Sequence, residues 1–338
     1  MLTIIAHHYV VNSGVTDCYD FQSITGNMIF LQLWGMWGKT AINGFILISG
    51  YFMCTSYLTV RRYAKVYLAA KFYSVVIFVI LALLGWQVLT FKEVFKCVFG
   101  FIWQINSLFI GSFLAFYMFI PFYNALLEKL AKKQLQQLIC MLILTSTVAS
   151  TFFFSSAAFT EVGWYMTLYF MAAYIRRYPA KWMNNNKVCG SAMVGTVLPS
   201  YLSIIIVDFV GVNYGFDNYY YMASNSNKIF AFMCGILAFL IFNNIDLVHS
   251  KIINTVASTT FGVLCIHANS DAMRTFLWTH LLNVRGMYNA PFGMLVLHAV
   301  ASMLGGFCIC SVIDLVRIRW IEKPVMALLD RLSQRHMI

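Results

Sequence analysis

The chain has 338 residues, of which 61% are hydrophobic and 10% are charged, and its formal net charge is +11. Soluble domains are typically about 45–50% apolar and about 25% charged, so this composition excludes an ordinary water-soluble fold. The expected fold class is therefore all-α, a polytopic bundle of transmembrane helices with the lipid bilayer as its solvent.

The first segment, residues 1–12, is apolar but short. A helix needs roughly 20 residues to cross a hydrocarbon core of about 30 Å, so this segment cannot span by itself. It also lacks the basic start and the small-residue cleavage site of a signal peptide. We expect it to be the outer part of a first helix whose beginning is absent from this sequence.

Apolar runs of spanning or nearly spanning length follow along the rest of the chain. The run at 160–176 is short, and residues 94–104 are too short to cross, which predicts a re-entrant or interfacial helix there. Without internal repeats or a low-complexity linker, residues 1–338 are expected to form a single membrane domain of about ten spans, the first one truncated. The other predicted spans are 40–57, 68–90, 106–124, 137–154, 160–176, 190–210, 227–243, 258–279 and 292–316.

Most of the Lys and Arg residues fall in alternate loops between these spans. Cytoplasmic loops of membrane proteins carry such an excess, so the pattern places the C-terminus in the cytoplasm. It also accounts for the net positive charge without a nucleic-acid partner. The cations assigned to the cytoplasmic side are Arg61, Arg62, Lys65, Lys71, Lys129, Lys132, Lys133, Arg176, Arg177, Lys181, Lys187, Lys251, Arg317, Arg319, Lys323, Arg331 and Arg335.

Two adjacent histidines, His7 and His8, lie in the first apolar segment. Ionisable groups are costly in a membrane, so they usually face a cavity or a partner, and imidazole suits proton transfer near neutral pH. Successive helix residues point about 100° apart, so only one of the two rings can face a given pocket squarely. The alternative is a hydrogen-bonded histidine near the interface.

The next span contains NGFILISGY, where Asn43 and Ser49 either allow close helix packing or border a polar cavity. Arg62 and Lys65 follow this span. They either bind phosphate groups or anchor the helix on the cytoplasmic side.

The second half of the chain contains four more candidates. His267 lies within FGVLCIHAN, and Glu322 follows the last span in WIEKP. Asp271 and Arg274 are three residues apart, so they are expected to pair on one helix. Each of the four can serve a site or a purely structural contact. The nine cysteines contain no C-x-x-C pair, and no metal site is expected.

Several of these segments occur together and in order, from about residue 4 to 324. They are IIAHHYV, NGFILISGYF, the basic cluster after it, SLFIGSFLAFYMFIPFYN, WYMTLYFMAAYIRRYP, TTFGVLCIHAN and WIEKP. Together they resemble the acyltransferase-3 family of membrane proteins. The resemblance implies a bacterial inner-membrane enzyme that moves an acyl group, in the closest members acetyl, from cytoplasmic acyl-CoA to a sugar hydroxyl across the membrane. It implies acetyl-CoA as co-substrate without a bound cofactor, and a polysaccharide or lipid-linked sugar as acceptor.

The family pattern can be carried over only residue by residue. Its first helix has Arg, ten residues and then His; His8 matches this His, and the Arg falls before Met1. Its Arg-x-x-Arg motif is matched by Arg62 and Lys65, where Lys keeps the charge but loses the planar fork. The resemblance thus implies that His8 is catalytic and that Arg62 and Lys65 bind acyl-CoA. The residues implied to line the cavity are His7, Asn43, Ser49 and His267, with Glu322, Asp271 and Arg274 as structural residues.

Two other functions fit the composition. A transporter or flippase for a polysaccharide or lipid-linked sugar has similar helices, although neither an inverted repeat nor paired Gly/Pro-broken spans are visible. A non-catalytic membrane partner in a polysaccharide assembly complex is the other alternative. Consumption of acyl-CoA separates the enzyme from both.

Overall fold

The computed structural model describes residues 1–100, 105, 109–154, 160–246 and 250–335. Within these ranges the chain consists of helices and loops without a strand, which confirms the predicted all-α class. The α-helices are α1 (Leu2–Val11), α2 (Gly26–Gly35), α3 (Gly38–Met53), α4 (Val60–Leu83), α5 (Phe91–Phe99), α6 (Phe109–Lys129), α7 (Lys132–Ile143), α8 (Ala149–Phe152), α9 (Glu161–Arg177), α10 (Asn186–Phe209), α11 (Ile229–Asn243), α12 (Lys251–His267), α13 (Asp271–Thr275), α14 (Phe292–Arg317) and α15 (Lys323–Arg335). Short 3₁₀- or π-helical segments are η1 (Val15–Cys18), η2 (Leu144–Val148), η3 (Lys181–Asn184), η4 (Gly211–Tyr214), η5 (Tyr221–Ala223), η6 (Phe276–Leu281), η7 (Arg285–Met287) and η8 (Ile318–Glu322).

Among the described residues, five helical stretches are long and apolar enough to cross a membrane. They are α4, α6, α7 with its continuation through α8, α10, and α14 with its continuation into α15. The apolar helices α1 and α11 are shorter, and α3, α9 and α12 have 16 or 17 residues each. These helices identify the chain as a membrane protein, while the number of spans stays a prediction.

The predicted span 258–279 is wrong, because α12 ends at His267 and α13 begins at Asp271. The Ser270 hydroxyl accepts a backbone N–H in the first turn of α13 at 3.2 Å, which caps the new helix. The Asn269 amide donates to a carbonyl in the last turn of α12 at 3.0 Å. These two polar side chains end one helix and start the next within an otherwise apolar stretch.

Two short helices differ from the sequence-based expectation: α2 was not expected, and α5 lies earlier in the chain than expected. The apolar part of α2 is too short to span alone, so it gave no signal of a membrane helix. The helix expected within 94–104 is α5, which begins and ends earlier, and residues 101–104 lie outside the described part of the chain.

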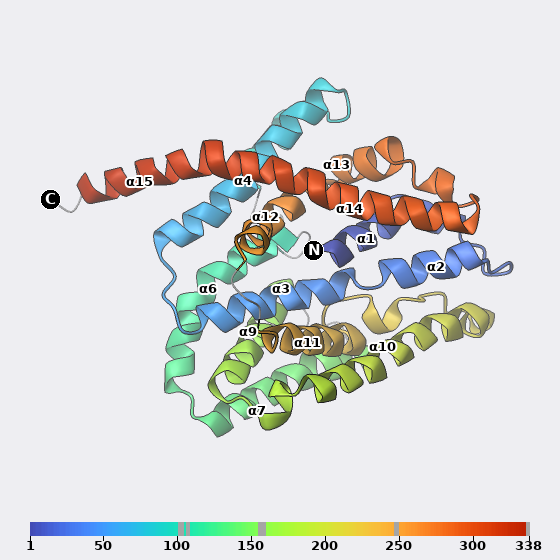
Figure 1. Cartoon of the computed structure of the whole chain (residues 1–338), viewed down its shortest axis with the longest axis horizontal. Helices are drawn as coiled ribbons and strands as arrows, with labels where there is room; N and C mark the ends of the chain where they lie inside the picture. The colour runs from blue at the N-terminus through green and yellow to red at the C-terminus, as the bar shows by residue number, and fades with distance from the viewer. Residues whose placement is uncertain (101–104, 106–108, 155–159, 247–249, 336–338) are drawn as a thin grey trace.

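The helices pack so that α1 is enclosed on several sides. In Figure 1, α2 and α3 run across the middle of the molecule, with α14 and α15 on one side and α10 and α11 on the other. Helix α1 packs against α2, α3 and α14, while α12 packs between α14 and α4. Ile5, Tyr9 and Val10 of α1 are buried in one apolar cluster with residues of α12 and α14. This packing fixes the face of α1 on which His8 lies.

Candidate active site

His8 of α1 and His267 of α12 lie next to each other, with ring centroids 5.1 Å apart. His267 is buried, with 2% of its surface exposed. Nδ1 of His8 and Nε2 of His267 are both buried and have no hydrogen-bond partner within the described ranges. Buried polar atoms in native proteins nearly always form a hydrogen bond with protein or ordered water. Each of these two nitrogens can therefore still form a hydrogen bond with a ligand.

The hydrogen bond of His267 fixes its tautomer. Its Nδ1 lies 2.6 Å from the carbonyl oxygen of Val263, one turn earlier in α12. A carbonyl oxygen only accepts, so Nδ1 carries the proton and donates. In the neutral ring Nε2 then has a free lone pair, which makes it a hydrogen-bond acceptor.

His7 has a different role from His8. Its Nδ1 lies 2.6 Å from the carbonyl oxygen of Gly35, at the end of α2. The backbone at Gly38 approaches the His7 ring so closely that an added Cβ atom would overlap the imidazole. His7 thus ties α1 to the junction of α2 and α3, which leaves the His8 ring to face the cavity, as the 100° step between neighbours requires.

His8 lines a cavity of about 120 Å³ together with three charged side chains from three other helices. Lys39 comes from the first turn of α3, Glu161 from the first turn of α9, and Arg274 from α13. The apolar part of the wall includes Ile4, Ile42, Phe109, Ile110 and Leu264. The cavity therefore combines an imidazole, two cations and a carboxylate, which are groups that suit acid–base chemistry on a polar ligand.

The sequence alone does not single out Lys39 or Glu161, and it leaves Arg274 either as a site residue or as a structural one. Glu161 Oε2 accepts a hydrogen bond of 2.5 Å from the Tyr165 hydroxyl, one turn later in α9. The predicted pair of Arg274 and Asp271 is confirmed, with an N–O distance of 2.6 Å. The Asp271 side chain is 97% exposed and that of Arg274 only 21%, so the arginine also reaches inward to the cavity.

Asn43 and Ser49, expected to line the cavity, lie elsewhere in α3. The Asn43 amide donates to the carbonyl oxygens of Ser226 and Ala231 at 2.7 and 3.0 Å, and its oxygen accepts from the Trp164 indole at 2.9 Å. The Ser49 hydroxyl donates to the carbonyl oxygen of Phe45 within its own helix at 2.9 Å. Asn43 therefore joins α3 to α9 and α11, and neither residue contributes to the cavity of His8.

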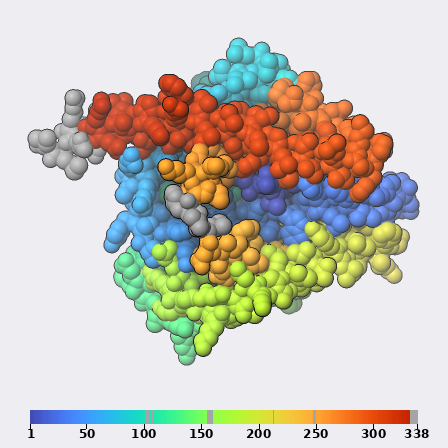
Figure 2. All heavy atoms as spheres, in the orientation of Figure 1, coloured from blue at the N-terminus to red at the C-terminus, as the bar shows by residue number. Residues whose placement is uncertain are grey.

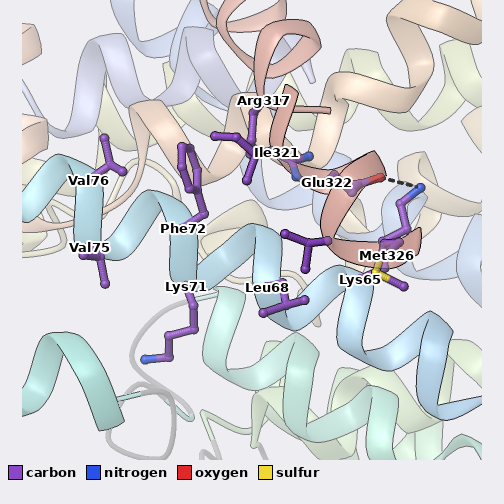
Figure 3. A pocket seen from close by; sticks show the side chains of 11 residues that line it. Lys65, Leu68, Lys71, Phe72, Val75, Val76, Arg317, Ile321, Glu322 and Met326 are labelled. Atoms are coloured by element: carbon purple, nitrogen blue, oxygen red, sulfur yellow. Dashed lines mark hydrogen bonds and ion pairs between the residues drawn. The ribbon is translucent and has the colours of Figure 1, made fainter. Parts of the chain in front are cut away.

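Arg62 and Lys65 lie near the start of α4, where both are exposed. Arg62 donates to the Tyr57 carbonyl oxygen at 2.9 Å. Lys65 pairs with Glu322 Oε1 at 3.0 Å, and Arg317 pairs with Glu322 Oε2 at 2.8 Å. Figure 3 shows Lys65 reaching across to Glu322 from the neighbouring helix. Glu322 thus joins α4 to the junction of α14 and α15.

The ion-pair network continues inward from Arg317 to Asp314, an acidic residue within the last predicted span that the sequence analysis did not single out. Arg317 Nε lies 2.7 Å from Asp314 Oδ1, and the Tyr73 hydroxyl donates to the same oxygen at 2.7 Å. Asp314 is fully buried and packs against Gly262, where an added Cβ would overlap the carboxylate. Gly262 precedes His267 in α12, so this network positions the helix that carries His267.

Comparison with known proteins identifies the family of the chain. The family model of acyltransferase-3, described as an acyltransferase domain, matches residues 1–315, a range that contains His8, His267, Arg62 and Lys65. No similar curated protein and no similar solved structure was found. The match covers most of the chain, and the long apolar helices agree with a membrane enzyme. The chain therefore belongs to the acyltransferase-3 family, whose members are acyltransferases, O-acetyltransferases among them.

Proposed function

We propose that the protein transfers an acyl group, in the simplest case acetyl, from acyl-CoA to a hydroxyl of a cell-envelope or exopolysaccharide sugar across the inner membrane. The observation that carries this proposal is the pair of His8 and His267, each with a buried ring nitrogen that has no hydrogen-bond partner among the described residues. Lys39, Glu161 and Arg274 line the cavity that His8 faces. An imidazole acceptor beside cations is suited to activating a hydroxyl and stabilising an oxyanion.

In the proposed reaction His8 accepts the proton of the sugar hydroxyl while the sugar oxygen attacks the thioester carbonyl. The new C–O bond gives a tetrahedral intermediate, and Arg274 or Lys39 stabilises its oxyanion. When the C–S bond breaks, the proton on His8 passes to the leaving thiolate, so the products are the O-acylated sugar and free CoA. The alternative is that His8 briefly carries the acyl group itself.

Arg62 and Lys65 are proposed to hold the phosphate groups of acyl-CoA at the cytoplasmic mouth. Guanidinium groups bind phosphate with two hydrogen bonds, and an ammonium acts as a point charge. The Lys65 side chain is 56% exposed although it pairs with Glu322. An ammonium has three N–H donors, so Lys65 can contact Glu322 and a phosphate together.

The test uses the full chain reconstituted in liposomes, with acetyl-CoA labelled in the acetyl group and an envelope polysaccharide extract as acceptor. The proposal predicts that free CoA is released only when acceptor is present and that the label moves to saccharide. A burst of free CoA before acceptor is added would instead indicate an acyl-His8 intermediate within the same function. Label that stays on CoA while intact saccharide crosses the vesicle membrane would contradict the proposal and indicate a transporter.

A further inference from the structure

A groove runs along α4 where η8 and α15 pack beside it, with a volume of about 350 Å³. Figure 3 shows its length, from Lys65 and Glu322 at one end to Val75 and Val76 at the other. The exposed surface of its wall is mostly apolar and is formed mainly by Leu68, Phe72, Val75, Val76, Ile321 and Val325. Lys71 also lines the groove, and its ammonium donates to the carbonyl oxygen of Cys97 at 3.0 Å. It is separate from the cavity of His8, which α4 does not line.

The position of the groove determines what kind of molecule can fill it. Both α4 and the stretch from α14 into α15 are candidate membrane spans, and Figure 2 shows the latter along the surface of the molecule. Leu68, Val75 and Ile321 are 38–41% exposed, so the groove opens to the surroundings. In a bilayer those surroundings are hydrocarbon. Val76 lies eleven residues after Lys65 on α4, which corresponds to a rise of about 16 Å along the helix. This length is close to the thickness of one leaflet, which is half of a hydrocarbon core of about 30 Å.

One end of the groove carries an excess of positive charge. Lys65 lines this end with its side chain 56% exposed and pairs with Glu322, while Arg317 is shared between Glu322 and the buried Asp314, so these four charges balance. The flanking turns of α4 and of η8 with α15 add the cations Arg61, Arg62, Arg319 and Lys323, against the carboxylate of Asp330. A ligand with a hydrocarbon chain and an anionic head group complements both features of the groove.

A second groove of similar size lacks the charges. It lies between α7 and α9, has a volume of about 390 Å³, and is equally apolar, with Leu144, Val148 and Met171 in its wall. Among the described residues that line it there is neither Lys nor Arg. The two grooves therefore offer the same hydrocarbon surface but only the one at α4 offers a cationic end.

We propose that the groove between α4 and η8–α15 binds an anionic phospholipid of the cytoplasmic leaflet. One acyl chain lies along Leu68 and Phe72 toward Val76, and the phosphate contacts the Lys65 ammonium. The anionic surface of that leaflet agrees with the side to which the Lys and Arg distribution assigns Lys65. Lys65 is also one of the two cations proposed for acyl-CoA, so lipid binding must be measured without acyl-CoA and independently of acyl transfer.

The experiment places the full chain in nanodiscs of equal parts phosphatidylglycerol and phosphatidylethanolamine and counts the retained lipids by native mass spectrometry after extraction. We expect phosphatidylglycerol to be retained about fivefold over phosphatidylethanolamine, the selectivity of one cation near an anionic lipid. Leu68→Trp fills the groove and should abolish this preference. Val148→Trp fills the second groove and should leave it unchanged.

A second variant keeps the test decisive if Leu68→Trp does not fold. Lys65→Gln leaves the apolar wall intact and should lower the preference for phosphatidylglycerol, because the cation that lines the groove is lost while the flanking cations remain. Equal retention of both lipids by the unmodified protein would overturn the proposal, and so would an undiminished preference in a folded Leu68→Trp protein.

Discussion

His8 and His267 come from helices that are far apart in the sequence, α1 and α12, yet their ring centroids lie 5.1 Å apart. Nδ1 of His267 donates a hydrogen bond to the Val263 carbonyl oxygen, while Nε2 has no partner in the described structure. Two rings this close, each with a ring nitrogen that has no partner among the described residues, can bind a single ligand together, such as a hydroxyl that donates to one of them.

Replacing His267 by Ala should lower kcat for acyl transfer by about 10–100-fold, because a ring that orients the acceptor hydroxyl beside His8 is lost. The KM for acyl-CoA should not change, since Arg62 and Lys65 are untouched. Initial rates with labelled acetyl-CoA measure both constants. A raised KM for acyl-CoA with normal kcat would show that His267 serves donor binding instead.

Arg274 and Asp271 form one ion pair but are expected to differ in function. Arg274→Gln removes a cation from the cavity wall and should lower kcat by about 100-fold, the usual effect of losing one oxyanion donor. Asp271→Asn alters a side chain that is 97% exposed and should leave kcat nearly unchanged. Equal losses in the two variants would mean that the ion pair, rather than the arginine in the cavity, is what matters.

The contact between Gly262 and Asp314 predicts a loss of stability from one methyl group. Gly262→Ala forces a Cβ atom into the carboxylate of Asp314 and should destabilise the fold by about 1–3 kcal/mol. Gly305→Ala is the matched control, because its Cβ would meet open space in another apolar helix. Thermal unfolding of both variants in the same detergent gives the comparison, and equal melting temperatures would contradict the close packing of α12 on α14.

The buried network predicts unequal effects of two arginines. Arg317→Met leaves Asp314 without its counter-ion in a site that is 0% exposed, and should destabilise by about 3–5 kcal/mol. Arg61 pairs with Asp330 in the open, where both side chains are largely exposed, so Arg61→Met should cause no measurable loss. The readout is again thermal unfolding, and a stable Arg317→Met protein would show that this network does not hold α14 in place.

The sequence predicted the helical class and most helix positions because long apolar runs leave few alternatives in a membrane. The sequence-based prediction of helix boundaries was wrong where short polar side chains end one helix and start the next. Ser270 and Asn269 divide the predicted span 258–279, and a Ser followed by Asp is a recognisable helix start that hydropathy alone overlooks. Helix α2 was missed since ten residues carry too little apolar length.

The site was predicted only in part. His8 and His267 were proposed as members of one site from the family resemblance, and the structure places them together. Lys39 and Glu161 were not proposed, because each is one charge at the end of an apolar helix, and such charges are common there. Which of them converge depends on how α3 and α9 pack around α1, and that information lies in tertiary contacts rather than in local sequence.

The central claim is that His8 carries out the acid–base chemistry, and His8→Ala tests it most directly. The measurement is the rate of acceptor-dependent CoA release by His8→Ala protein, beside the unmodified protein and His280→Ala, which removes an exposed histidine outside the cavity. The account predicts a loss of at least about 100-fold for His8→Ala, with an unchanged melting temperature, and a normal rate for His280→Ala. A folded His8→Ala protein that acylates the acceptor at the normal rate would contradict it.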